Sequence, residues 1–238
     1  MLEQLQAILY FFGHGFCHQL PERSFEVGGL YFSVCARDTG IYLGLVFTVI
    51  VVCIYYHRYK IKPSGLPPIW AIIVCFVLVL PMAFDGATSY LGLRETTNLL
   101  RYITGYLCGA GIGVLASSAI LSFRRDAIYT FKVAEKPVQL AAILTATAAA
   151  GAAFYLLYPY LGVVSPFIVL IAHLLIMTVV TLLVMNSVLR VGISGEINNN
   201  SRLVKLVLIA IMLALAEIAL MALIAHGIHL AFPDFVHP

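Results

Sequence analysis

Six long, uninterrupted runs of apolar residues limit what this chain can fold into. A helix that crosses a bilayer needs roughly 20 apolar residues, because the hydrocarbon core is ~30 Å thick and a helix rises ~1.5 Å per residue. Lipid tolerates only helices or closed barrels, and barrels require alternating rather than continuous hydrophobicity. The runs therefore predict an all-α, polytopic transmembrane helical bundle. Its six spans are expected at about residues 40–56, 68–84, 99–122, 137–158, 166–189 and 203–232.

The composition agrees with this prediction. The chain has 238 residues, of which 62% are hydrophobic and 11% charged, with a mean hydropathy of +1.00. Soluble domains carry about 25% charged residues. The formal net charge of +3, without a basic cluster interleaved with aromatic residues, argues against nucleic-acid binding. Because no repeat, low-complexity tract or composition shift is visible, residues 1–238 are predicted to form a single integral membrane domain.

The N-terminal residues 1–39 differ from the spans that follow. Residues 5–12 are apolar but too short to cross a bilayer, and polar residues flank them. They predict an interfacial or re-entrant helix. A signal peptide is not expected, because a basic n-region and a small-residue cleavage site are both missing before the polar motifs.

The distribution of Lys and Arg predicts the orientation of the chain. The loops after the first, third and fifth spans hold ten of them, and the opposite side holds four. Basic residues gather on the cytoplasmic side. Both termini are therefore expected outside the cytoplasm. The ten are Arg58, Lys60, Lys62, Arg124, Arg125, Lys132, Lys136, Arg190, Arg202 and Lys205, and the four are Arg23, Arg37, Arg94 and Arg101.

The segment between the second and third spans carries polar side chains on this outer side. Asp85 follows the second span, and a third helix that begins near Thr96 would place Asn98 and Arg101 on one face, with Arg94 just ahead of it. Arginine near a helix N-terminus suits a phosphate or carboxylate. The alternative is that these arginines pair with Asp85, Glu95 or Asp38 and only hold loops in place. The same face continues as Gly105, Gly109 and Gly113, a spacing at which helices approach closely in lipid.

Cys17-His18 and Cys35-Ala36-Arg37-Asp38 form a second polar group on the outer side. Thiolate, imidazole and carboxylate groups ligate zinc and other transition metals, and His14 lies one helical turn before this pair and is an alternative ligand. A disulfide between Cys17 and Cys35 is the alternative structure, and it is favoured by spacing alone outside the cytoplasm.

Two polar residues lie deep within the last two spans. Glu217 is at mid-span in the sixth, and His173 lies at a similar expected depth in the fifth. A carboxylate at mid-membrane costs at least ~2.5 kcal/mol. These residues therefore mark a proton relay or a substrate contact, or they form one interhelical hydrogen bond. His226, near the outer end of the sixth span, either joins the outer pocket or sits at the interface.

Three motifs in order carry a resemblance to a known family: CHQLPERSF, CARDTGIYLG and DGATSYLGLRETTNLLRYITG, which begin at Cys17, Cys35 and Asp85. Together they resemble an uncharacterised prokaryotic family of predicted membrane proteins, catalogued as a domain of unknown function. Its members often read Cys-x-Arg-Cys where this chain has Asp38 as the fourth residue. The resemblance implies a metal site, with Asp38 replacing a cysteine ligand, and it supplies no reaction.

Three functional hypotheses follow. The first is an outward-facing pocket, enzymatic or purely binding, that acts on an anionic lipid headgroup or small anion. In it Cys17, His18, Cys35 and Asp38 would hold zinc or another transition metal, Asp85, Arg94, Asn98 and Arg101 would act on the anion, and Arg23 and Arg37 lie nearby. The second is a transporter or lipid carrier that uses Glu217 and His173. The third is an accessory subunit of a membrane complex.

Overall fold

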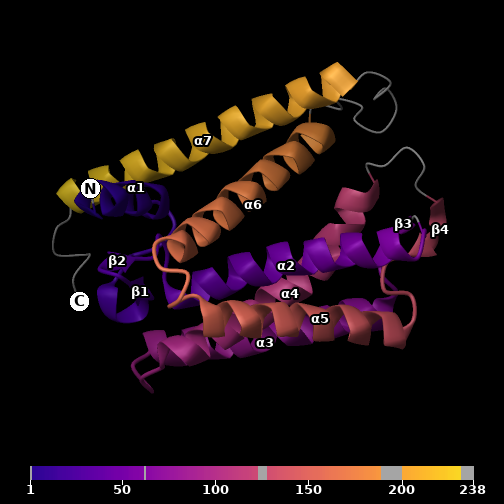
Figure 1. The fold of residues 1–238 in the computed structure, drawn as a ribbon, viewed down its shortest axis with the longest axis horizontal. Coiled ribbons are helices and arrows are strands. Elements are labelled where there is room, and N and C mark those ends of the chain that lie inside the picture. The colour runs from indigo at the N-terminus through magenta and orange to yellow at the C-terminus, as the bar shows by residue number, and fades with distance from the viewer. Residues whose placement is uncertain (1, 62, 123–127, 189–199, 232–238) are drawn as a thin grey trace. The chain divides into compact units, whose positions relative to one another are not determined.

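The computed structural model describes residues 2–61, 63–122, 128–188 and 200–231 (Figure 1). Six helices in these ranges are long and apolar enough to cross a membrane, which confirms the predicted fold class. Each overlaps one predicted span. They are α2 (Ala36–Arg58), α3 (Ile69–Tyr90), α4 (Asn98–Ser122), α5 (Pro137–Leu157), α6 (Val164–Val188) and α7 (Asn200–Ala231).

Two helix boundaries differ from the prediction in a way that affects the polar residues. Helix α3 continues beyond residue 84 to Tyr90, so the expectation that Asp85 lies in a loop is wrong. Helix α2 begins at Ala36 rather than near residue 40, which places Arg37 and Asp38 in its first turn. Hydropathy finds the apolar part of a helix, and both of these extensions are polar.

Short elements fill the segments outside the spans. The predicted N-terminal helix is present as α1 (Leu2–Gly13). It is followed by a 3-10 turn, η1 (Pro21–Arg23), and a hairpin of β1 (Glu26–Val27) and β2 (Leu30–Tyr31). Gly28 and Gly29 make the hairpin turn with φ of +59° and +80°, which only glycine adopts readily. A second, parallel pair joins β3 (Pro63–Gly65) to β4 (Ile128–Lys132).

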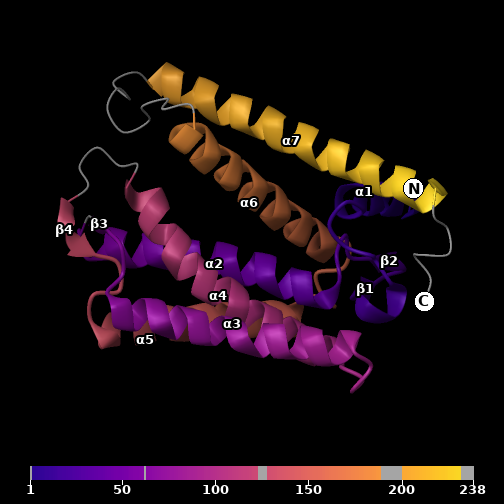
Figure 2. The same cartoon turned by 180° about the vertical axis from the view of Figure 1, so that it is seen from behind.

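The chain forms two compact units, each described here by itself. The first comprises Met1–Ala36, Tyr158–Arg190 and Ser201–Pro238, and the second comprises Arg37–Leu157 and Val191–Asn200. In the first unit α6 and α7 run side by side, and α1 lies beside the C-terminal end of α7 (Figures 1 and 2). The second unit contains α2 to α5 and the β3–β4 pair. The division falls within the first turn of α2.

Helix α4 is the central helix of the second unit. Its most apolar stretch is 61% buried, against 17% for the corresponding stretch of α3. A Cβ added at Gly105, Gly109 or Gly113 would lie less than 3.0 Å from backbone atoms of α2. The three glycines therefore allow the two backbones to touch, as expected for small residues at this spacing in lipid.

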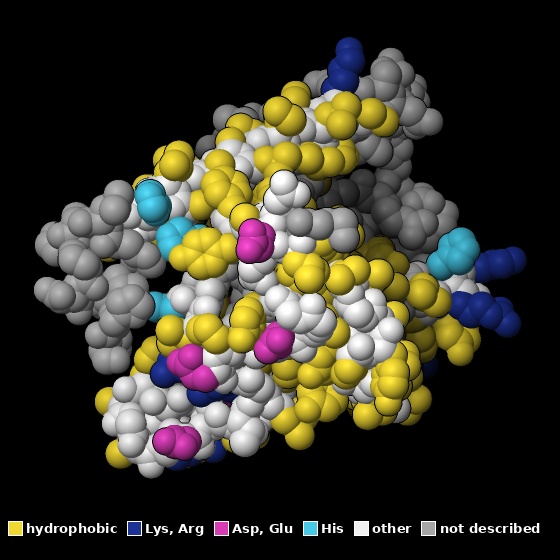
Figure 3. All heavy atoms as spheres, turned by 60° about the vertical axis from the view of Figure 1, so that its left-hand side comes forward, with side chains coloured by type: hydrophobic (Ala, Val, Ile, Leu, Met, Phe, Trp, Pro, Cys, Tyr) yellow, Lys and Arg dark blue, Asp and Glu magenta, His cyan; other side chains and the backbone are white. Residues whose placement is uncertain are grey.

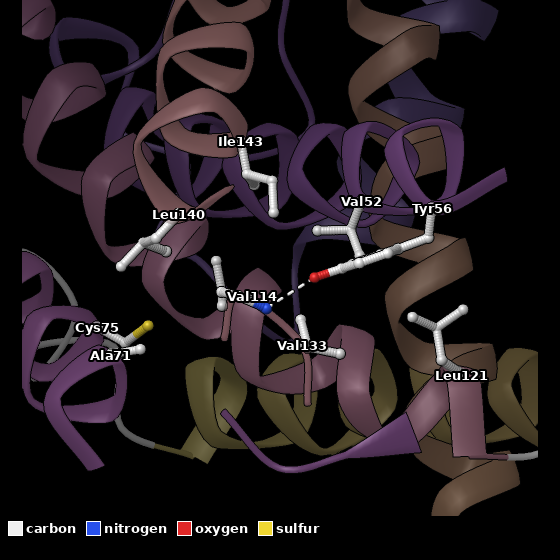
Figure 4. Packing of buried hydrophobic residues seen from close by; sticks show 10 residues of the cluster. Val52, Tyr56, Ala71, Cys75, Val114, Leu121, Val133, Leu140 and Ile143 are labelled. Carbon is white, nitrogen blue, oxygen red and sulfur yellow. Dashed lines mark hydrogen bonds between the residues drawn. The ribbon is translucent and has the colours of Figure 1, made fainter. Parts of the chain in front are cut away.

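A cluster of buried hydrophobic residues lies where α2, α4 and α5 pack together in the second unit. Val52 and Tyr56 from α2 pack there with Val114 from α4 and Ile143 from α5 (Figure 4). The Tyr56 hydroxyl accepts a hydrogen bond from the backbone N–H of Ala134 at 2.8 Å. This bond attaches the chain between β4 and α5 to α2 across 78 positions of sequence.

Hydrophobic side chains cover much of the surface in view in Figure 3, and charged side chains occur in small groups among them. Large apolar side chains on the spans are widely exposed, for example Phe76 at 63% and Ile171 at 56%. Lipid is as apolar as these side chains, so their exposure is the expected outer surface of a membrane protein.

Candidate functional site

Among the described charged residues of the second unit, Asp85 is the best buried. Its side chain has no solvent exposure, yet it lies on α3, among the longest apolar runs of the chain. It accepts hydrogen bonds from Arg37, from Nε at 3.2 Å and more closely from Nη2. A buried carboxylate is stable only when it is paired and hydrogen-bonded, and Arg37 supplies the first pair.

Arg94 forms the second ion pair with Asp85. Its Nη2 donates to Asp85 Oδ1 at 2.7 Å, and its Nε donates to Thr88 Oγ1 at 2.9 Å. The guanidinium also lies 5.6 Å from the centre of the Phe84 ring, a cation–π contact. Phe84 and Thr88 flank Asp85 on successive turns of α3, so one helix face orients the arginine. Sequence reasoning missed both residues, although their spacing of four is a helical signal.

Two arginines share the single carboxylate of Asp85, so this trio carries one net positive charge. The Arg37 side chain is 13% exposed and the Arg94 side chain is 35% exposed. Arg94 therefore keeps part of its guanidinium accessible while Asp85 fixes its position. A guanidinium that is fixed in position and partly exposed is a suitable ligand for a phosphate or carboxylate.

Asn98 and Arg101 lie in the first turn of α4. Arg101 Nη1 donates to Asn98 Oδ1 at 3.1 Å, and Arg101 is 9% exposed. The N-cap of the helix is one residue later than predicted, because Thr97 Oγ1 accepts the backbone N–H of Leu100 at 3.3 Å. Of the pairings expected for these arginines, the one between Arg94 and Asp85 is present.

The first unit brings Cys17 and Cys35 together. The backbone N–H of Cys35 donates to Cys17 Sγ at 3.2 Å, and their sulfur atoms are not joined in a disulfide. Cys35 immediately precedes α2, and Asp38 follows it by three residues within the first turn. Local helix geometry alone, rather than the arrangement of the two units, therefore sets the position of Asp38 relative to Cys35.

One ligand atom from each of Cys17, Cys35 and Asp38 lies within 4.8 Å of the other two. All three residues are partly buried. Tetrahedral zinc with Zn–S distances of ~2.3 Å and Zn–O distances of ~2.0 Å holds its ligand atoms roughly 3.3–3.8 Å apart. The three ligand atoms thus need to approach one another by at most about 1 Å to bind one ion, a change within reach of rotamer adjustment.

The remaining predicted residues of the N-terminal segment lie outside this group of three. His18 is exposed, and among the described residues it is not part of the cluster. Cys17 accepts a hydrogen bond from the backbone N–H of Cys35, whereas the side chain of its neighbour His18 is exposed. Arg23 ends η1 with a half-buried side chain.

Glu217 and His173 belong to the first unit. Glu217 accepts a hydrogen bond from Thr181 Oγ1 at 3.2 Å, which joins α7 to α6. His173 is fully buried and packs edge-on against Phe16, with ring centres 4.8 Å apart. Thr181 is eight residues beyond His173 along α6, which is about two helical turns.

Comparisons with known proteins cover the segment that carries most of these residues. The model of a family described as "Predicted membrane protein (DUF2085)" matches residues 17–115. An uncharacterized protein of Methanocaldococcus jannaschii is 43% identical over 93 residues, which are 39% of this chain and 56% of that protein. One from Methanothermobacter thermautotrophicus is 40% identical over 99 residues, which are 42% of this chain and 82% of that protein.

The chain thus spans only about half of the length of the first of these relatives, 56%. No solved structure matches it. The family match begins at Cys17 and includes Cys35, Asp38, Asp85 and the three arginines Arg37, Arg94 and Arg101. It ends before His173 and Glu217.

Proposed function

This chain belongs to the family of predicted membrane proteins DUF2085, and on that premise we propose that it is a multi-pass cell-membrane protein that holds a transition metal beside an anion-binding group of arginines. Cys17, Cys35 and Asp38 would be the metal ligands. The observation that carries this proposal is the approach of their ligand atoms to within 4.8 Å of one another.

The chemistry of the three ligands fits a borderline-soft metal such as zinc. Two sulfur ligands favour zinc over magnesium or calcium, and carboxylate is a common third ligand. The N–H of Cys35 supports a thiolate at Cys17 by donating to its sulfur. Cys35 and Asp38 also lie at the N-terminus of α2, where the helix dipole favours negative groups.

A set of three protein ligands leaves a fourth position for water or substrate, which is the arrangement of catalytic rather than structural zinc sites. A metal bound there would act as a Lewis acid toward a substrate oxygen. Arg37 is adjacent to Asp38 in the chain and shares the Asp85 carboxylate with Arg94. These arginines would hold an oxyanion, either a lipid headgroup or a small soluble anion.

Metal content tests the first part of the proposal. Protein purified without chelators should contain about one zinc or other transition-metal ion per chain by mass spectrometry of the elements, because a site with three protein ligands binds one ion. Cys17→Ser and Cys35→Ser should each lose it. Cys53→Ser is the matched control, since Cys53 lies within α2 away from the site, and it should keep the ion.

Metal-free wild-type protein whose Cys17 and Cys35 resist alkylation until they are reduced would overturn the metal site in favour of a disulfide. Equal metal content in wild type and in both serine variants would also overturn it.

Anion binding tests the second part. In nanodiscs, Arg94→Gln should weaken binding of an anion about tenfold, since a charge-assisted hydrogen bond contributes ~1.5–3 kcal/mol. Arg23→Gln is the control, because Arg23 lies on the same expected side and outside the Asp85 group. One arm uses nanodiscs with an anionic lipid, and the other uses neutral nanodiscs with a soluble phosphate ester. Unchanged affinity for Arg94→Gln in both arms would contradict the role of the arginines.

The orientation of the chain is part of the same proposal. The excess of Lys and Arg after the first, third and fifth spans supports an extracytoplasmic position for both termini. A membrane-impermeant maleimide should then label Cys17 in metal-stripped, reduced whole cells. Labelling only after the cells are lysed would reverse the orientation.

A further inference from the structure

A cavity of about 860 Å³ lies in the first unit between α1 and the C-terminal part of α7. These two helices lie next to each other in Figures 1 and 2. Its volume is within the range of about 300–1,000 Å³ that is typical of small-molecule sites. The lining residues that matter for recognition are Leu2, Glu3, Phe11, His14, Leu223 and His226.

The walls of this cavity are apolar and open outward. Leu2 is 47% exposed, Phe11 is 43% exposed and Leu223 is 64% exposed. In a chain that spans a membrane, exposed apolar walls between a short helix and the end of a span allow a hydrocarbon chain to enter from the side. The apolar part of the cavity thus suits an alkyl or isoprenoid chain.

The polar part is acidic and aromatic. Glu3 contributes a carboxylate, and among the described residues that line the cavity none is Lys or Arg. Tyr10 and Phe11 add aromatic rings, and ring faces attract ammonium groups. His14 and His226 face each other from the two helices with ring centres 6.4 Å apart. An anionic headgroup would meet the Glu3 carboxylate, with no lysine or arginine among the described lining residues to pair with it.

We infer that this cavity binds a single-chain amphiphile with an ammonium headgroup. The chain lies against Leu2, Phe11 and Leu223, and the ammonium group pairs with Glu3. None of the described lining residues belongs to the proposed metal or arginine groups, and the charge preference of the cavity is opposite to that of the arginines.

The test compares two spin-labelled probes of equal chain length, an octadecylammonium and an octadecanoate, with the full chain in neutral nanodiscs. Electron paramagnetic resonance measures the immobilised fraction of each. The ammonium probe should be immobilised several-fold more strongly than the carboxylate probe. Glu3→Gln should remove this preference, since it removes the lining carboxylate while keeping the size of the side chain.

Two tryptophan variants locate the binding. Leu223→Trp should reduce the immobilised ammonium fraction by filling the cavity. Leu220→Trp should leave it unchanged, because Leu220 is comparably exposed on α7 but does not line the cavity. Equal immobilisation of both probes, a preference for the carboxylate, or equal effects of the two tryptophans would overturn the inference.

Discussion

Arg94 donates a 2.7 Å hydrogen bond to Asp85, a carboxylate without solvent exposure on the preceding helix. Together with Arg37 this pair joins α2, α3 and the start of the segment before α4. The group is therefore structural as well as a candidate anion site. Both roles follow from the same geometry, because a rigid guanidinium is what recognises an oxyanion well.

Asp85→Asn should be strongly destabilising. It leaves two arginines without their shared counter-charge, and breaking one side of a buried ion pair costs about 3–5 kcal/mol. Thermal unfolding in detergent should show a large loss of stability for Asp85→Asn. It should show almost no loss for Glu95→Gln, because Glu95 is an exposed neighbour of Arg94. Similar stability for the two variants would show that the buried group does not hold the helices together.

Gly105→Ala should destabilise the contact between α4 and α2. The added Cβ would collide with the carbonyl oxygen of Arg37, and overpacking of this kind costs about 1–3 kcal/mol. Gly86→Ala is the matched control, because its Cβ would meet only Arg37 Nη1 at 3.9 Å. Unfolding measurements should separate the two variants, with Gly86→Ala neutral or slightly stabilising. The close packing would be refuted by equal stability.

Tyr56→Phe should cost about 1–3 kcal/mol, because the buried N–H of Ala134 loses its acceptor. Tyr59→Phe, at an exposed position one turn later, should leave the stability unchanged. Hydrogen exchange at Ala134 provides a local measurement, and it should accelerate only in Tyr56→Phe. Unchanged protection of that amide would rule out the bond.

Thr181→Val should weaken the association of α6 with α7 by about 0.6 kcal/mol, the average for such bonds in membranes. Thr178→Val is the control, because Thr178 bonds only to a carbonyl of its own helix in the described structure. If Glu217 served only as this hydrogen-bond acceptor, Glu217→Gln would be tolerated. A loss of substrate flux in Glu217→Gln at normal stability would favour the transporter hypothesis instead.

The sequence predicted the six spans well because continuous hydropathy is a direct consequence of the solvent around them. It misplaced Asp85, since the counter-charges that make a helical aspartate tolerable come from Arg37 and Arg94 in other segments. The β1–β2 hairpin and the β3–β4 pair were missed as well. Strands of two to five residues carry little periodicity to detect.

The candidate metal ligands could be predicted only in part. Cys17, Cys35 and Asp38 come together, but their approach depends on how the chain turns through η1 and the hairpin, which no spacing rule gives. His18 is exposed because the turn directs its neighbour Cys17 inward. The cavity between α1 and α7 was outside the prediction for a similar reason, since it joins opposite ends of the chain.

X-ray absorption at the edge of the copurifying metal tests the central claim most directly. The proposal predicts two sulfur scatterers at about 2.3 Å and oxygen at about 2.0 Å, from the two thiolates and a carboxylate. In Cys17→Ser the metal, and with it the absorption edge, should be lost. A first shell of nitrogen and oxygen only, or wild-type protein with no metal to measure, would contradict it.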